Sequence, residues 1–126
     1  MLGDAMADAV DDWWIIGGAA VALYGAAPPQ VKDVDVVLSV SDALRILPGL
    51  GVALTPGEAD RRFRSDFYCQ WNVPPVQVDF MAGFHAFDRL LIPATRLPVA
   101  IGGSTVFIPS REELVTILRH FGRPKD

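Results

Sequence analysis

The chain has 126 residues, of which 51% are hydrophobic and 21% charged, and this composition excludes an intrinsically disordered protein. Eleven basic side chains against fifteen acidic ones give a net charge of −4, which argues against binding nucleic acid or an anionic membrane through bulk electrostatics. The single cysteine, Cys69, excludes an internal disulfide and fits a reducing, cytoplasmic setting. The longest apolar run, 13–27, is interrupted by glycines and is too short to span a bilayer. We expect a single domain over residues 1–126.

Hydrophobic runs and turn residues predict alternating helices and strands in the first half of the chain. Residues 13–16 are four bulky apolar residues that end at two glycines, which is typical of a buried strand followed by a turn. The run 31–40 is rich in β-branched residues and predicts a second strand. The elements expected here are a helix over 5–12, a strand over 13–16, a helix over 19–26, a strand over 31–40, a helix over 41–47 capped by Ser41, and a helix over 55–62.

Two strand pairs and a closing helix are predicted in the second half. Ser110 and Glu113 have the spacing of a capping box, and apolar residues follow at helical spacing as far as Phe121. The elements expected here are strands over 66–71 and 76–81 as one hairpin, strands over 98–101 and 105–108 as another, and a helix over 110–121. The whole order predicts an α+β fold in which helices flank a mixed β-sheet.

Asp33-Val34-Asp35 places two carboxylates on one face of the predicted strand, because side chains alternate between faces. Their Cα atoms are about 6–7 Å apart at a rise of about 3.3 Å per residue, so the side chains can converge on shared divalent cations. Two negative charges near an apolar sheet are unfavourable unless a cation neutralises them. About one Asp-x-Asp triplet is expected by chance in this composition, so a solvated strand end is the alternative.

A third carboxylate, Asp79, projects opposite to Val78 and Phe80 in the run 76–81. A lone acid in such a strand is more often an edge or solvent residue than a ligand. If this strand lies beside the one that carries Asp33 and Asp35, however, Asp79 completes a cluster of three carboxylates. Hard oxygen ligands of this kind suit Mg²⁺, which shares its coordination shell with phosphate.

Gly17-Gly18 separates a predicted strand from a predicted helix. Glycines at the start of a helix leave backbone N–H groups open to a phosphate, with no Cβ in the way. A tight turn without any ligand explains the pair equally well. The spacing matches neither a Walker loop nor a GxGxxG fingerprint.

Other side chains give weaker indications. Basic residues gather shortly before the strand at 66–71, where a solvated loop and a contact with a triphosphate or nucleic acid are both open interpretations. This group consists of Arg61, Arg62 and Arg64, together with the neighbouring uncharged Ser65. Trp13, Trp14 and Trp71 lie in apolar strands and are expected in the core, and Cys69 is expected to be a buried, inert thiol.

In combination, these pieces resemble the nucleotidyltransferase superfamily, which has the polymerase-β-like fold. The superfamily pattern is a strand, Gly-Gly or Gly-Ser, a helix, Asp-x-Asp between hydrophobic residues, and a third acid on a later strand. The segments IIGGAAVALYG, KDVDVVL, VQVDF and GRPKD are similar, more narrowly, to small bacterial nucleotidyltransferase-like proteins related to the toxins of abortive-infection toxin–antitoxin pairs.

The resemblance implies an activity and a site. Asp33 and Asp35 would hold two Mg²⁺ ions, Asp79 would complete the ion that faces the acceptor, and Gly17 and Gly18 would cradle the triphosphate. The implied reaction moves an NMP group from an NTP to a hydroxyl of an RNA, a protein or a small molecule, and releases pyrophosphate. The alternative is an inactive interaction or antitoxin-like module that keeps the fold.

High apolar content suggests a partner, either a second copy of the chain or a helical protein. The expected contact surfaces are the closing helix and the segment 84–98, which carries several large apolar residues. The large apolar residues of this segment are Phe84, Phe87, Leu90, Leu91 and Ile92. The alternative is that they fill the core.

Overall fold

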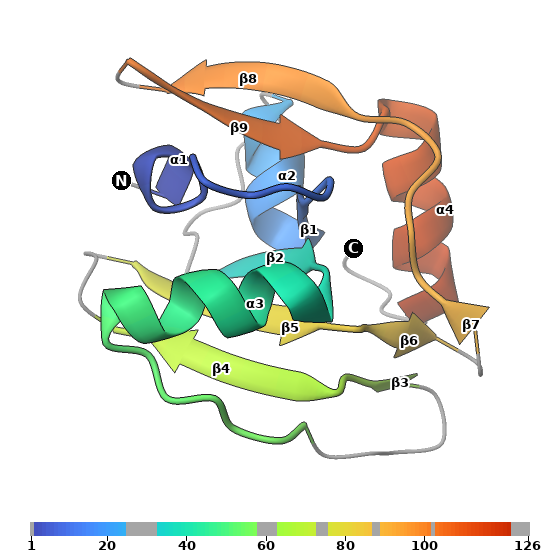
Figure 1. Cartoon of the computed structure of the whole chain (residues 1–126). Coiled ribbons are helices and arrows are strands. Elements are labelled where there is room, and N and C mark those ends of the chain that lie inside the picture. The colour runs from blue at the N-terminus through green and yellow to red at the C-terminus, as the bar shows by residue number, and fades with distance from the viewer. Residues whose placement is uncertain are drawn as a thin grey trace.

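The computed structural model describes residues 2–24, 33–57, 63–72, 76–86, 89–101 and 103–121 (Figure 1). Its main sheet has four strands in the order β1-β2-β5-β4. Their bounds are Trp14–Ile16 for β1, Asp33–Leu38 for β2, Phe67–Trp71 for β4 and Gln77–Ala82 for β5. β2 and β5 run parallel, whereas β1 and β4 each pair antiparallel with their neighbour. The predicted α+β class with a mixed sheet is confirmed.

Helices and two smaller sheets surround the main sheet. The helices are α1 (Leu2–Ala5), α2 (Gly17–Leu23), α3 (Val40–Ile46) with the 3₁₀ turn η1 (Leu47–Leu50), and α4 (Arg111–Phe121). The small strands are β3 (Phe63–Arg64), β6 (His85–Ala86) and β7 (Arg89–Leu90) in one sheet, and β8 (Leu97–Ile101) and β9 (Ser104–Ile108) in a hairpin. Among the described helices, none has the length and apolar character needed to cross a membrane.

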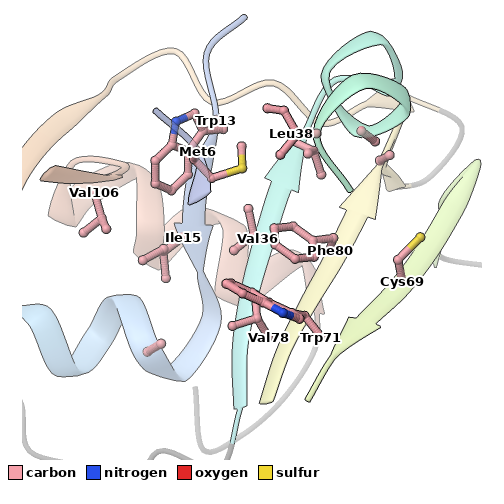
Figure 2. Close-up of a cluster of buried hydrophobic side chains, with 14 of the residues drawn as sticks. Met6, Trp13, Ile15, Val36, Leu38, Cys69, Trp71, Val78, Phe80 and Val106 are labelled. Carbon is pink, nitrogen blue, oxygen red and sulfur yellow. The ribbon is translucent and has the colours of Figure 1, made fainter. Parts of the chain in front are cut away.

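The larger hydrophobic core lies on one face of the main sheet (Figure 2). Val36 of β2 and Phe80 of β5 are fully buried there, and α3 and the β8–β9 hairpin contribute to the same cluster. The opposite face carries a smaller cluster, formed by Trp14, Ile16, Val37, Met81 and Phe84. The predicted burial of the three tryptophans and of Cys69 is confirmed.

Both predicted hairpins are present, although the turn at 73–75 lies outside the described residues. The closing helix begins as its sequence indicates, because the Ser110 hydroxyl accepts a hydrogen bond from the Glu113 N–H at 3.2 Å. The Glu113 carboxylate does not complete a capping box. It accepts hydrogen bonds from the N–H groups of Ala94 and Thr95, at 2.6 and 2.7 Å, and from the Thr95 hydroxyl. Burial opposes ionisation of Glu113, but these hydrogen bonds outweigh it and lower its pKa.

The predicted helix over 5–12 is wrong, since α1 covers Leu2–Ala5 and the chain then turns. A distant side chain explains the difference. The carboxylate of Asp42, which is fully buried, accepts hydrogen bonds from the N–H groups of Val10 at 3.1 Å and Asp11 at 2.9 Å. These N–H groups are therefore committed to another element and cannot continue a helix.

Three further expectations need correction. The helix expected over 19–26 already begins at Gly17, and the cap of α3 is Ser39 rather than Ser41. The Ser39 hydroxyl accepts a hydrogen bond from the Asp42 N–H at 3.1 Å. The helix expected over 55–62 does not begin at Thr55, because the Thr55 carbonyl accepts a hydrogen bond from the Tyr68 N–H at 2.9 Å and holds this segment against β4. Residues 58–62 lie outside the described part of the chain.

Candidate functional site

Three aspartates come together on one face of the main sheet. The parallel pairing of β2 and β5 sets Asp35 directly opposite Asp79 in register, and Asp33 lies two residues earlier on the same face of β2. One carboxylate oxygen from each residue lies within 4.8 Å of those of the other two. The predicted proximity of the three side chains is confirmed, because β2 and β5 are neighbours as that prediction required.

The cluster runs from solvent into the sheet. Asp33 is exposed, Asp35 is half-buried, and Asp79 is only 3% exposed. Buried carboxylates are rare without hydrogen bonds or a cation to balance their charge. Three hard oxygen donors at this spacing match the preferences of Mg²⁺, and the residues present therefore fit a divalent cation.

Asp79 receives hydrogen bonds from two uncharged side chains that the sequence did not single out. The Tyr68 hydroxyl donates to Asp79 Oδ2 at 3.0 Å, and the Gln77 amide nitrogen donates to Asp79 Oδ1 at 2.7 Å. Gln77 and Asp79 are two positions apart on β5, so alternation alone puts them on one face. Tyr68 reaches the same face from β4, and only the register of the β4–β5 hairpin reveals that contact.

The Tyr68 hydroxyl is held in its protonated form. Burial, the hydrogen bond to Asp79, and the negative charges of Asp79, Asp35 and Asp33 together raise the pKa of Tyr68 to about 12. All these causes disfavour a phenolate next to the cluster. Tyr68 is therefore a hydrogen-bond donor throughout the neutral pH range.

The two glycines before α2 differ in their surroundings. Gly17 is buried with φ +71°, and a Cβ built on it would lie 3.0 Å from Asp35 Oδ2. A side chain at this position would thus meet both a strained backbone and the carboxylate cluster. Gly18 is exposed, and no heavy atom lies within 4 Å of its built Cβ among the described neighbours. The Gly-Gly turn is therefore adjacent to the cluster, with Gly17 next to Asp35 and Gly18 open to solvent.

The basic group is placed only in part. Arg61 and Arg62 lie outside the described residues, and the Arg64 side chain is not described. The backbone of Arg64 pairs with His85 of β6, and Ser65 is half-buried. This pairing sits beyond the carboxyl end of β5, whereas Asp79 is in the first half of that strand. A nucleotide contact by Arg61, Arg62, Arg64 or Ser65 stays a prediction.

Comparisons with known proteins identify the fold. No protein-family model matches the sequence, and neither does any curated protein. A candidate nucleotidyltransferase from Thermotoga maritima is similar in structure, with a TM-score of 0.82 and 16% identity over 98% of this chain and 82% of that one.

Two other solved structures agree with that match. The antibiotic-resistance factor ANT(2'')-Ia, in complex with adenylyl-2''-tobramycin, matches with a TM-score of 0.58 and 17% identity over 97% of this chain and 74% of its own. An antigenic nucleotidyltransferase-like protein from Paracoccidioides brasiliensis matches with a TM-score of 0.56 and 21% identity, over 98% and 64% of the two chains. The chain therefore has a nucleotidyltransferase fold, as its sequence motifs predicted.

Proposed function

We propose that the protein is a Mg²⁺-dependent nucleotidyltransferase that moves an NMP group from an NTP to a hydroxyl acceptor and releases pyrophosphate. The observation that carries this proposal is the cluster of Asp33, Asp35 and Asp79, with ligand atoms within 4.8 Å of one another, on a nucleotidyltransferase fold. The site needs no nucleophilic side chain, because nucleotidyl transfer depends on positioning and charge neutralisation.

Each side chain has a proposed role in this reaction. Asp33 and Asp35 would hold the cations, expected to number two with nucleotide bound, and Asp79 would complete the set on the acceptor side. Mg²⁺, when bound, supplies charge neutralisation for the phosphates and makes a bound hydroxyl more acidic. The backbone N–H groups of Gly17 and Gly18 would receive the triphosphate next to the carboxylates, where a residue with a Cβ at position 17 would intrude on Asp35.

The acceptor is an RNA, a protein or a small molecule in this proposal. ANT(2'')-Ia, which shares the fold, has been seen with an adenylylated tobramycin, and this supports a small-molecule hydroxyl as one class. The motif resemblance supports a role as the toxin of a cytoplasmic toxin–antitoxin pair. A second copy or a helical protein would then dock on α4 and on the segment 84–98. In that segment Leu90 and Ile92 are exposed, Phe84 is buried, and Phe87 lies outside the described residues.

The test is label transfer from each α-³²P-labelled NTP in the presence of Mg²⁺ and a cell extract. The wild-type protein should transfer label, and Asp35→Asn should abolish transfer while it leaves the protein folded. Asp8→Asn is the matched control, because Asp8 is an exposed aspartate outside the cluster. If no NTP gives transfer, and NTP binding is absent or insensitive to Asp35→Asn, the protein is the inactive interaction module instead.

A further inference from the structure

Both oxygens of the most buried carboxylate in the cluster are engaged by neutral donors. Tyr68 donates to Oδ2 of Asp79 at 3.0 Å from the neighbouring strand β4, and Gln77 donates to Oδ1 at 2.7 Å from the same strand β5. One donor on each oxygen fixes the plane of the carboxylate as well as its position. A carboxylate has about four lone-pair sites, so Asp79 can accept both hydrogen bonds and still coordinate a cation.

The orientation of Asp79 needs this restraint because the nearby carboxylates of Asp33 and Asp35 repel it. Asp79 is only 3% exposed, and a carboxylate oxygen of Asp33 and one of Asp35 lie within 4.8 Å of one of its own. Repulsion between like charges favours any rotamer that turns Asp79 away from the other two. Hydrogen bonds to a carboxylate are stronger than those between neutral groups, and the two from Tyr68 and Gln77 oppose that rotation.

We propose that Tyr68 and Gln77 are positioning residues, which hold Asp79 toward Asp33 and Asp35 in the orientation that a divalent cation requires. The inference rests on the proposed function, since it assigns these two residues to the metal site of that function. Replacement of a residue that orients a metal ligand commonly lowers the affinity of the site for the metal by about 10–100-fold. Both residues are uncharged, so they orient Asp79 without neutralising the charge that attracts the cation.

The surroundings of Tyr68 support a role at the site rather than in the core. Its side chain is on the face of β4 opposite Cys69 and Trp71, which are buried in the larger core. Tyr68 itself is 37% exposed, so its ring is not a principal part of either hydrophobic cluster. The hydroxyl can therefore be removed as Tyr68→Phe while the ring and the sheet contacts are retained.

The experiment measures Mn²⁺ affinity by electron paramagnetic resonance of the free ion, with Mn²⁺ as the probe because it takes the same oxygen ligands as Mg²⁺. Tyr68→Phe and Gln77→Met should each weaken Mn²⁺ binding by about 10–100-fold. Gln70→Met is the matched control, because Gln70 lies opposite Asp79 in the β4–β5 register with an exposed side chain, and it should leave the affinity unchanged. Thermal unfolding of each variant checks that the fold is intact.

A second set of variants separates positioning from a general structural effect. If Tyr68 and Gln77 act through Asp79, their substitutions should have no further effect on Mn²⁺ affinity in an Asp79→Asn background. A loss of equal size in that background would overturn the inference. So would wild-type affinity in both single variants. Failure of the wild-type protein to bind Mn²⁺ would instead refute the proposed function itself, and the positioning role with it.

Discussion

Substitution of Gly17 by alanine tests whether the Gly-Gly turn is shaped by the carboxylate cluster. Gly17 has φ +71°, a left-handed conformation that costs a residue with a Cβ about 1–2 kcal/mol. The added methyl group would also lie 3.0 Å from Asp35 Oδ2, closer than ordinary van der Waals contact. Asp35 would have to shift by a few tenths of an ångström or the turn would have to open.

The expected result has two parts. The free energy of unfolding should fall by about 1–2 kcal/mol, which lowers the melting temperature of a protein of this size by roughly 3–8 °C. Mn²⁺ affinity should also fall, by about tenfold, because the displaced neighbour is a proposed ligand. Urea denaturation followed by the fluorescence of the buried tryptophans measures the first quantity, and resonance of free Mn²⁺ measures the second.

Gly18→Ala is the matched control, one residue further along. Its Cβ would meet no heavy atom within 4 Å, and its φ is not in the left-handed region. Because Gly18 lies inside α2, alanine should leave stability unchanged or raise it by up to about 1 kcal/mol. Mn²⁺ affinity should stay at the wild-type value, whereas NTP affinity should fall if the Gly18 N–H receives a phosphate. Equal losses of stability in the two variants, or wild-type behaviour of Gly17→Ala, would refute this account.

Three further results are expected. Asp42→Asn should lower the free energy of unfolding at pH 7 by about 1–3 kcal/mol. Burial opposes ionisation of Asp42, but hydrogen bonds from Val10, Arg45 and Asp11 outweigh it and lower its pKa. The wild-type advantage should therefore be complete above the ordinary pKa of an aspartate, and it should be lost as the pH falls from there through the lowered pKa. Phe80→Ala, at a fully buried position, should lower the free energy of unfolding by about 3–5 kcal/mol, measured by urea denaturation. Saturating Mg²⁺ at 100 times its Kd should stabilise the wild-type protein by about 2.7 kcal/mol, and calorimetry should show no such gain for Asp35→Asn.

Most, but not all, of the aspartate cluster could be predicted from local rules. Because side chains alternate between the two faces of a strand, Asp33 and Asp35 were expected on one face. By the same rule, Asp79 was expected on the face opposite to Val78 and Phe80. The remaining step, adjacency of the two strands, was not local. It came from the resemblance to the nucleotidyltransferase superfamily, and the parallel β2–β5 pairing confirms it. The hairpins and the start of α4 were also local, since turn residues and one serine cap specify them.

What the sequence did not predict depends on contacts between distant residues. The helix expected over 5–12 fails because Asp42, more than thirty positions away, takes the N–H groups of Val10 and Asp11. Helical propensity is a weak preference, and a buried carboxylate with two amide donors outweighs it. Tyr68 was overlooked for the same reason, because its hydroxyl meets Asp79 only once the register between β4 and β5 is known.

The proposed cation site and the smaller core share one face of the main sheet, and this would link cation binding to folding. Val37 and Met81 are buried in the smaller core, and Asp35 and Asp79 stand one strand repeat earlier on the same face of β2 and β5. Apolar neighbours lower the local dielectric constant, so repulsion among the carboxylates is stronger than it would be in water. A bound cation would remove this repulsion from the folded state alone, because the unfolded chain does not assemble the three aspartates. The arrangement that suits the cluster to a cation therefore also makes the metal-free protein less stable than its two cores would otherwise allow.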